Sequence, residues 1–507
     1  MNPVSLSVPR ERLRTICIAG SGQVGVIAAL ALKRALPDAQ VIVIGLADDP
    51  TAYADTASTA LPFTNKLHDR LGLSEDELIR RAGASHRLIT RYAGWAGEGA
   101  DAVGAVPYGA PADTQARARF AREWGGGSRG ALAAPGSRLP ATSLPQVLAE
   151  AGRFAVPPGD MPTPLDEVDY ALRWNSPAYR DILIERAQQA GVIYLPGPIQ
   201  GHEPDGKGGI AAIGVDGQGP IAADLFVDCS GPAARLISAM PGAQWEDWGD
   251  VLPVRRILHA RPGQAMLALE DRFTLTRQGW LMEQAGRDGL HMALGLAPQM
   301  GEQDAVQVMT QTLGAQPARL VEVAPGCHRE SWLGNVVALG DAAAWFEPLA
   351  HLNLDLAHRQ LALLLEMLPG LAIEPLERAE FNRRAHLMAV QVRDTLATHY
   401  AAPRARSIFG EAPLPEGLDR VIDQYTRRGR LPHREEAALL AAEYMALLDA
   451  LGLPGAVPVS ARATASAESA AALRAFEEQA QRALAFAPPY AQFMQQMLAA
   501  GAAPAPV

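Results

Sequence analysis

One stretch near the start decides the fold: Thr15-Ile16-Cys17-Ile18-Ala19-Gly20-Ser21-Gly22-Gln23-Val24-Gly25. Its first five residues form a short apolar run, which is typical of a buried parallel strand. The glycines that follow fit the pattern G-x-G-x-x-G at the point where the strand turns into a helix. In such a turn Gly20 permits the tight bend, Gly22 lets the backbone approach a phosphate, and Gly25 allows helix and strand to pack closely.

The residues after the glycines extend this motif into a strand-helix-strand unit. The pattern predicts a helix over 24–36 and a second apolar strand over 40–44. The start of the helix offers free N–H groups and the positive end of the helix dipole to the phosphates of a dinucleotide. The candidate cofactor contacts in this turn are Gly20, Gly22, Gln23, Val24 and Gly25.

The second strand lacks the acidic residue that usually binds the ribose hydroxyls of a dinucleotide. Gly45 stands at that position, and Asp48 and Asp49 follow on a loop. A glycine turn can also serve structure alone, because tight strand-to-helix turns need glycine without any ligand. The sequence therefore predicts a dinucleotide site and leaves the binding of its adenosine half undecided.

The length and composition are those of a globular protein with two or three domains: the chain has 507 residues, of which 48% are hydrophobic and 20% are charged. The net charge of -10, with no offsetting Lys/Arg cluster, excludes nucleic acid as a partner. The chain has three cysteines, Cys17, Cys229 and Cys327, an odd number that predicts buried thiols in a reducing compartment. No two of them form a Cys-x-x-Cys motif, so we expect no metal site. No signal peptide or membrane span is visible, which predicts a cytoplasmic protein.

Two later segments repeat the design of an apolar strand followed by a glycine turn. Residues 224–231 end in Ser230-Gly231, and residues 334–343 contain Gly340-Asp341. Together with the first turn, these segments are what a bipartite flavin site requires. The Asp341 carboxylate and the nearby N–H groups can reach the ribityl and pyrophosphate atoms, although Asp341 could also be a simple helix cap.

The rest of the chain is predicted to divide into inserted and C-terminal parts. The region 125–145 is rich in glycine, alanine and proline and is predicted to be a long loop, either a lid or a disordered insertion. Apolar residues at helical spacing predict helices over 63–71, 74–82, 177–190, 361–368, 375–400, 418–428, 434–451 and 466–486. We expect a cofactor domain over 1–370, a substrate subdomain inserted at about 83–175 and 245–330, and a helical region over 371–507.

With these segments in order, the sequence resembles the flavin-dependent tryptophan halogenase family. The resemblance rests on the 20–25 turn, on 224–231 (family pattern DLFIDCSG), on 332–340, on Phe346-Glu347-Pro348-Leu349, and on Arg393-Asp394 with His399-Tyr400. It spans roughly residues 14–405. It implies an α/β (α+β) fold: an FAD-binding, Rossmann-like domain of flavin-monooxygenase type, a substrate β-sheet subdomain and a mainly helical C-terminal cap.

The resemblance also implies the cofactor and partners. FAD would arrive as FADH2 from a separate flavin reductase, a transient partner, and the substrate would be a small molecule or peptide. In that family reduced flavin meets O2, halide attacks the peroxide, and hypohalous acid travels through a tunnel to an aromatic substrate. Leu349 belongs to the flavin-proximal turn, and Trp280, Trp345 and Phe346 are candidates to contact substrate or flavin. The apolar C-terminal helices could support a homodimer.

The residues that perform halogenation in that family are absent. His86 stands where the family has its essential lysine, and the chain's only lysines are Lys33, Lys66 and Lys207. Ala350 replaces the family's glutamate, and His351-Leu352 replaces the Ser-Thr pair of the halide site. The family's Trp-x-Trp-x-Ile-Pro signature keeps only Trp280, and its Gly-Glu-Ala-Thr loop survives as a remnant over 55–59.

His86 and His351 are therefore the candidate acid/base residues, because imidazole titrates near neutral pH. His86 could instead lie on a solvated helix face beside Arg87 and Arg91, and His351 could bond a loop carbonyl. We expect an FAD-dependent oxidoreductase, monooxygenase- or halogenase-like, that uses reduced FAD and O2 on an unidentified substrate, for which an aromatic or indole compound is one option. The alternatives are a catalytically degenerate flavoprotein or partner subunit with a binding role, and a halogenase with displaced catalytic groups.

Overall fold

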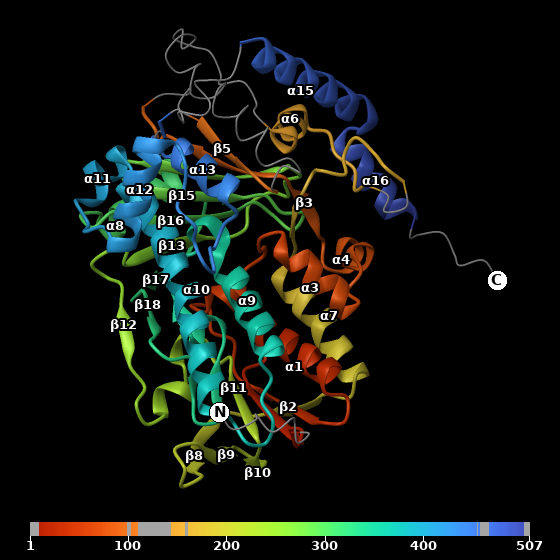
Figure 1. The fold of residues 1–507 in the computed structure, drawn as a ribbon, viewed down its shortest axis with the longest axis vertical. Coiled ribbons are helices and arrows are strands. Elements are labelled where there is room, and N and C mark those ends of the chain that lie inside the picture. The colour runs from red at the N-terminus through yellow and green to blue at the C-terminus, as the bar shows by residue number, and fades with distance from the viewer. Residues whose placement is uncertain are drawn as a thin grey trace, which may run out of the picture.

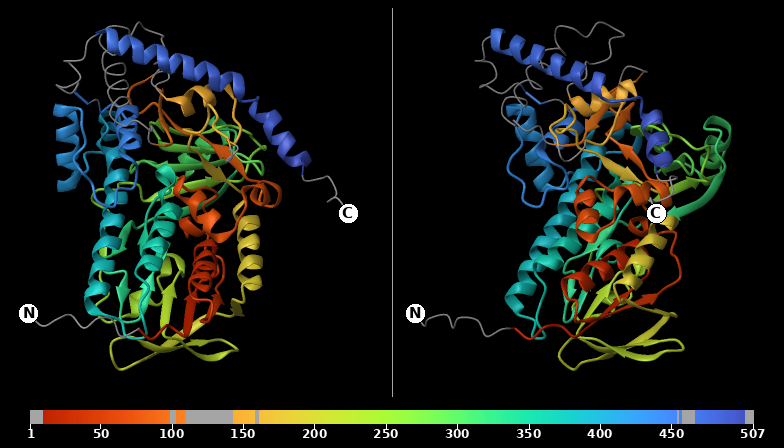
Figure 2. Two further views of the ribbon diagram at one scale, coloured as in Figure 1. Left: turned by 45° about the vertical axis from the view of Figure 1, so that its right-hand side comes forward. Right: turned by 90° about the vertical axis from the view of Figure 1, so that its right-hand side faces the viewer.

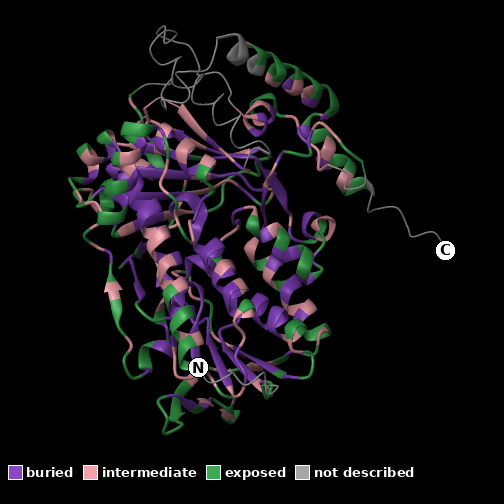
Figure 3. Cartoon of the chain, in the orientation of Figure 1, coloured by how far each residue is buried: buried purple, intermediate pink, exposed green. Residues whose placement is uncertain are grey.

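The computed structural model describes residues 10–98, 103–109, 143–157, 161–453, 455–456 and 466–500. Two large β-sheets lie one above the other in Figure 1, and helices cover both. Figure 3 shows that the buried residues gather along these sheets and on the helix faces turned toward them. None of the helices within these ranges is long and apolar enough to cross a membrane.

The lower sheet is built around the glycine-turn strand. Its order is β19 (Trp332–Leu333), β20 (Val336–Ala338), β11 (Leu225–Asp228), β1 (Thr15–Ala19), β2 (Gln40–Gly45) and β7 (Ile193–Pro196), with all neighbours parallel except β19 and β20. Because β1 is covered on both faces, its apolar run is almost wholly buried. Helix α1 (Gln23–Ala35) packs against β1 and β2, and helices α7 (Ser176–Gln189) and α9 (Leu352–Glu366) pack against α1. The predicted Rossmann-like arrangement is confirmed.

The upper sheet has seven strands drawn from both predicted parts of the substrate subdomain. Its order is β17 (Pro317–Glu322), β13 (Arg256–Ala260), β16 (His291–Leu296), β15 (Gly279–Gln284), β14 (Glu270–Thr276), β4 (Ile89–Ala93) and β5 (Val103–Pro107). A parallel pairing of β4 with β14 joins the two parts, and the other pairings in this sheet are antiparallel.

Smaller sheets connect or extend the two large ones. They are β3 (Ser85–Arg87) with β6 (Ala171–Arg173); β12 (Trp245–Asp247), β18 (Gly326–His328) and β21 (Ala344–Trp345); and β8 (Ile199–Pro204), β9 (Ile210–Val215) and β10 (Gly219–Ala222). The N-terminal helices are α2 (Tyr53–Thr56), α3 (Phe63–Leu71), α4 (Glu75–Arg81) and α6 (Leu144–Ala151); α8 (Glu302–Gln307) lies beside the upper sheet.

The C-terminal region is helical, as predicted. It holds α10 (Pro375–Ala401), α11 (Pro403–Phe409), α12 (Glu416–Arg428), α13 (Ala441–Ala450), α15 (Ser466–Phe486) and α16 (Tyr490–Ala500). Figure 2 shows α15 and α16 running along the outside of the upper half, where they contact α6 and α4.

Two predicted helix boundaries are wrong. Most of the predicted loop lies outside the residues that the structure describes. The helix expected over 434–451 begins only at Ala441, because Glu436 has a positive φ of 52° and Leu440 donates its N–H to the Glu443 carboxylate, which caps the helix. The helix expected over 361–368 begins at Leu352, directly after two residues with positive φ. Residues 125–142 of the predicted loop lie outside the described residues, and its last residues, 143–145, form the start of α6.

Candidate functional site

The three predicted glycine turns meet at the start of α1. A Cβ on Gly20 would lie 2.1 Å from the carbonyl oxygen of Cys229, so the turns after β1 and β11 touch backbone to backbone. A Cβ on Gly25 would lie 2.1 Å from the Gly20 carbonyl oxygen, and one on Gly340 would lie 3.2 Å from Val24. The structure therefore brings the predicted residues of all three turns together.

Residues 52–59, here called the crossing segment, run over these turns. The Gln23 side chain is buried and donates from Nε2 to the carbonyl oxygens of Ala54, Asp55 and Ala57, at 2.8, 3.0 and 2.8 Å. The N–H of Ala54 donates to Oδ2 of Asp341 at 2.7 Å. Gln23 and Asp341 thus hold the segment that replaces the family's Gly-Glu-Ala-Thr loop.

Asp55 occupies the position where the glycine turn would receive a phosphate. Its Oδ1 accepts the Val24 N–H at 2.9 Å, and a Cβ on Gly22 would lie 2.1 Å from its Cγ. Burial raises the pKa of Asp55 to about 6, although the bond from Val24 and the charge of Arg180 act the other way. The space left by Gly22 therefore holds an internal carboxylate at a helix N-terminus, which is an anion site in chemical terms.

Asp341, Ser230 and Gly231 complete the surroundings of these turns. Asp341 is buried, its pKa is raised well above the ordinary value by burial, and within the described part of the chain its Oδ1 has no hydrogen-bond partner. Ser230 bonds Asp228 and accepts the Arg235 N–H, so it shapes its own turn. The unpartnered oxygen of Asp341 fits a ribityl hydroxyl of FAD, whereas a phosphate would have to displace Asp55 from the space beside Gly22.

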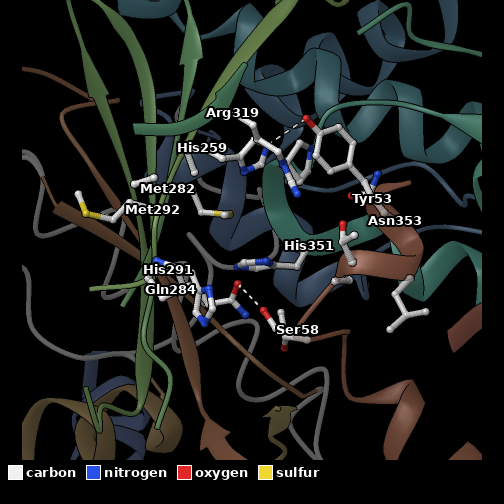
Figure 4. A pocket seen from close by; sticks show the side chains of 18 of the residues that line it. Tyr53, Ser58, His259, Met282, Gln284, His291, Met292, Arg319, His351 and Asn353 are labelled. Carbon is white, nitrogen blue, oxygen red and sulfur yellow. Dashed lines mark hydrogen bonds between the residues drawn. The ribbon is translucent and has the colours of Figure 1, made fainter. Parts of the chain in front are cut away.

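A cavity of about 320 Å³ lies between the crossing segment, the upper sheet and the start of α9 (Figure 4). Polar side chains reach it from each of these elements: Ser58, His259, Gln284, His291, Arg261, Arg319, His351 and Asn353. Met282 and Met292 add apolar surface. None of the described residues that line this cavity is acidic, so the cavity favours a neutral or anionic ligand.

His351 lies in the middle of the cavity wall in Figure 4. It has a positive φ of 59°, and its Nε2 lies 3.4 Å from Oδ2 of Asp271. Burial, with the charges of Arg87 and Arg173, lowers the pKa of His351 to about 3 against the opposing charge of Asp271. The imidazole is therefore neutral and only weakly basic at physiological pH, and its Nε2 can accept a hydrogen bond.

A buried ion cluster that the sequence analysis missed lies behind His351. Asp271 pairs with Arg87 at 3.0 Å and with Arg173 at 2.8 Å, and all three side chains are almost inaccessible. Burial alone would raise the pKa of Asp271, but the two guanidinium groups hold it below the ordinary value. The one available sequence signal was an arginine next to His86 in a segment that proves to be a buried strand.

His86 lies on the other side of this cluster and does not line the cavity. Its carbonyl accepts a bond from Arg173 at 2.6 Å. Its ring nitrogens form two hydrogen bonds: Nε2 with the Glu75 carboxylate at 2.8 Å, and Nδ1 with the Tyr490 hydroxyl at 3.0 Å. The aromatic rings around it belong to Phe154, Tyr170, Tyr490 and Phe493. The solvated-helix reading of His86 is wrong, since the residue is on a fully buried strand; its catalytic role stays a prediction.

The His86 surroundings lead to a stability prediction. His86→Ala is expected to lower the free energy of unfolding by about 3 kcal/mol, because it leaves a cavity and unpairs Glu75. Tyr490→Phe, which removes only a hydroxyl, should cost about 1 kcal/mol. Urea unfolding measures both. A His86→Ala variant that keeps wild-type stability but loses turnover would instead support a direct catalytic role.

The predicted substrate contacts are all part of the wall structure behind the cavity. Trp280 is buried and donates from Nε1 to Glu347, whose carboxylate also accepts the Tyr400 hydroxyl at 2.7 Å. Burial raises the pKa of Glu347 to about 7. Trp345 donates to the Thr51 carbonyl at 3.0 Å, and Phe346, like Leu349, is fully buried. None of Trp280, Trp345, Phe346 or Leu349 lines the cavity.

A parallel sheet with three converging glycine turns, joined to a second sheet across a cavity, defines an FAD-binding fold of the flavin-monooxygenase type. The sequence profile of the tryptophan halogenase family matches residues 15–466. The chain therefore belongs to the tryptophan halogenase family. Flavin-dependent halogenases use FADH2 supplied by a separate flavin reductase, and FAD is accordingly the cofactor of this chain.

The similarity to individual members extends over most of their length. Tryptophan 7-halogenase RebH from Lentzea aerocolonigenes is 24% identical over 449 residues, which cover 82% of each chain. Among solved structures, the flavin-dependent halogenase BrvH from Brevundimonas sp. BAL3 is 25% identical with a TM-score of 0.82, covering 96% of this chain and 99% of its own. The flavin-dependent halogenase Xcc4156 from Xanthomonas campestris, at 23% identity and a TM-score of 0.85, covers 98% and 100% and shares the fold.

Proposed function

We propose that this chain is an oxidoreductase that uses reduced FAD and O2 on a small organic substrate, with aromatic compounds as the first class to test. The observation that carries the proposal is the cavity between the crossing segment and the upper sheet, at the junction with the three glycine turns. When bound there, reduced FAD supplies the reaction with O2. The chain supplies binding groups, orientation and a cavity lined by polar side chains and two methionines.

The residues that would hold FAD lie in a continuous path. The N–H groups at the start of α1 would take the phosphates, and Asp341 has a free carboxylate oxygen for a hydroxyl of the ribityl chain. Arg319 reaches the cavity with an Nε that has no hydrogen-bond partner among the described residues. Arginine donors in a cavity without acidic lining favour the reduced ring system, whose anionic form carries one negative charge.

The groups present do not support halogenation by a lysine and a glutamate. Ala350 has no ionisable group, and none of the three lysines lines the cavity. Lys33 donates to the carbonyls of Pro37 and Ala39 beyond the end of α1, and Lys207 is in the turn between β8 and β9. We therefore propose oxygen transfer or oxidation rather than halogenation, with neutral His351 as the group that accepts a hydrogen bond from the substrate and orients it at the cavity wall.

The test is FAD binding followed by a turnover assay. The purified chain is titrated with oxidised FAD and, without oxygen, with reduced FAD, and then given a flavin reductase, O2 and aromatic substrates with and without bromide. We expect micromolar or tighter binding of reduced FAD and oxygenated rather than brominated products. His351→Ala should lower turnover at least 100-fold without loss of flavin binding. His202→Ala, an exposed change on β8, is the control.

A second candidate function rests on the position of Asp55. Because a carboxylate already occupies the phosphate end of the glycine turn, the chain could be a degenerate member that serves as a binding or partner subunit. This reading predicts no flavin binding in either redox state and no effect of His351→Ala. Brominated products would overturn the proposal of oxygenation and favour a halogenase with displaced catalytic groups.

A further inference from the structure

Three potential metal ligands meet outside the cavity. They are Glu246 on β12, Cys327 on β18 and His386 on α10, and one donor atom from each lies within 4.8 Å of the other two. Cys327 Sγ lies 3.9 Å from Nδ1 of His386, and His386 Nε2 lies 3.7 Å from Oε2 of Glu246. No part of this group lines the cavity or touches the glycine turns.

The charged neighbours of the group leave one side of Glu246 available. Arg393 and the indole N–H of Trp248 approach its Oε1, at 3.4 and 3.2 Å, whereas Oε2 faces His386. Arg393 also pairs with Asp394 at 2.8 Å, so its charge is already balanced. Glu246 therefore keeps a negative charge directed at the sulfur and the imidazole.

We propose that Glu246, Cys327 and His386 form a binding site for Zn²⁺. A thiolate, an imidazole and a carboxylate are the donor types that zinc prefers, with bonds of about 2.0–2.3 Å. A tetrahedral ion with such bonds needs donors about 3.3–3.8 Å apart, whereas one donor atom of each residue now lies within 4.8 Å of the others. One ring nitrogen of His386 would bind the ion, after rotation of the Glu246 and His386 side chains. Both side chains are about one-third exposed, which makes rotation possible and leaves the fourth position to water.

The charges and protons balance when the ion binds. Cys327 is a buried free cysteine, and a free thiol ordinarily carries its proton at neutral pH. Binding replaces this proton by Zn²⁺ and releases the proton to the buffer. One thiolate and one carboxylate then neutralise the two positive charges of the ion, so that the occupied site has no net charge.

The site would link β12, β18 and α10, which lie next to elements that support the cavity wall. β18 pairs with β21, which leads into Phe346 and Glu347, and α10 carries Tyr400, the hydrogen-bond donor to Glu347. Zinc would therefore tie α10 to the small sheet β12–β18–β21. The sequence analysis predicted no metal site, because the three ligands are 81 and 59 residues apart and form no short motif.

The experiment measures metal binding to the full chain after removal of metal with a chelator. We expect one equivalent of Zn²⁺ by calorimetry, one proton released, and a higher melting temperature. Co²⁺ should give a thiolate-to-cobalt charge-transfer band. Cys327→Ser should remove the band and weaken Zn²⁺ binding at least 100-fold. Cys17→Ser, a buried thiol on β1 without a nearby histidine, is the matched control.

A second variant separates loss of the site from loss of folding. His386→Ala changes a side chain that is about one-third exposed, so the variant should fold normally, as checked by circular dichroism, yet bind Zn²⁺ at least 100-fold more weakly. Binding without the charge-transfer band, or binding that survives in both Cys327→Ser and His386→Ala, would overturn the proposal. Failure of any metal to bind would do the same and would leave the proposed flavin chemistry untouched.

Discussion

Asp55→Asn is expected to tighten FAD binding about tenfold at pH 8. In the parent chain the Asp55 carboxylate occupies the Val24 N–H, and a bound pyrophosphate would have to displace this charge and remain near it. A carboxylate at a helix N-terminus is stabilised by up to about 2 kcal/mol, and tenfold in affinity corresponds to about 1.4 kcal/mol. Asparagine keeps the shape of the side chain and removes the competing charge.

The same carboxylate makes binding depend on pH in the parent. The pKa of Asp55 is raised to about 6, so the side chain is neutral below that pH and charged above it. FAD affinity of the parent should therefore fall as pH rises through about 6, and the advantage of Asp55→Asn should disappear below pH 5. Because the folded pKa exceeds the unfolded one, the stability of the flavin-free chain should also fall as pH rises from about 4 to 6.

Flavin fluorescence titrations between pH 5 and pH 8.5 measure this effect. Asp48→Asn is the matched control, because it removes an equal charge that lies on the surface, paired with Arg180. An equal increase in FAD affinity in both variants would show that the negative charge of the protein surface weakens binding in general, and not the contact of Asp55 with the Val24 N–H. Weaker binding by Asp55→Asn at every pH would show that Asp55 supports the flavin site instead of competing with the phosphates.

The second large effect is expected from Asp271→Asn. This change leaves the guanidinium groups of Arg87 and Arg173 buried without their shared counter-charge. Removing one partner of a buried pair typically costs about 3–5 kcal/mol, and here one carboxylate serves two cations. We expect a loss of that size in the free energy of unfolding, with a lower melting temperature.

Urea unfolding at pH 7.5 measures the loss, with Asp288→Asn as the control because Asp288 is only partly buried. Arg87 and Arg173 hold the pKa of Asp271 below its ordinary value, so its contribution should persist down to the range of that lowered pKa and disappear only in stronger acid. A loss below about 1 kcal/mol would mean that backbone carbonyls, such as those of Ala60 and Glu270, balance the arginines.

Local patterns predicted the cofactor half of the molecule because its determinants are contiguous in sequence. The Gly20–Gly25 turn needs a strand, three glycines and a helix, and each is visible in a window of about 20 residues. The two later turns ending in Gly231 and Asp341 could be placed for the same reason. The meeting of these turns at one point follows from the parallel order of their strands.

The opposite side of the site could not be predicted in this way. The Asp271 cluster joins residues from β3, β6 and β14, and no local pattern distinguishes such an arginine from one on the surface. The sequence predicts an acid/base role for His86, but the aromatic residues that enclose it come from positions as distant as Tyr490. Asp55 approaches Gly22 because the crossing segment folds back over the glycine turn. The small residues of this segment contain no local sequence pattern that predicts such a path.

The order of strands in the lower sheet has a consequence for synthesis on the ribosome. β1 pairs with β2 on one side and with β11 on the other, and 183 residues separate Gly45 from Asp228, the ends of those two partners. At about 5–20 residues per second, one edge of β1 stays unpaired for roughly 10–40 seconds after β2 has emerged. An open edge of an apolar strand is a template for pairing with other chains. The nascent protein therefore carries an unpaired strand edge during this interval, however stable the finished fold is.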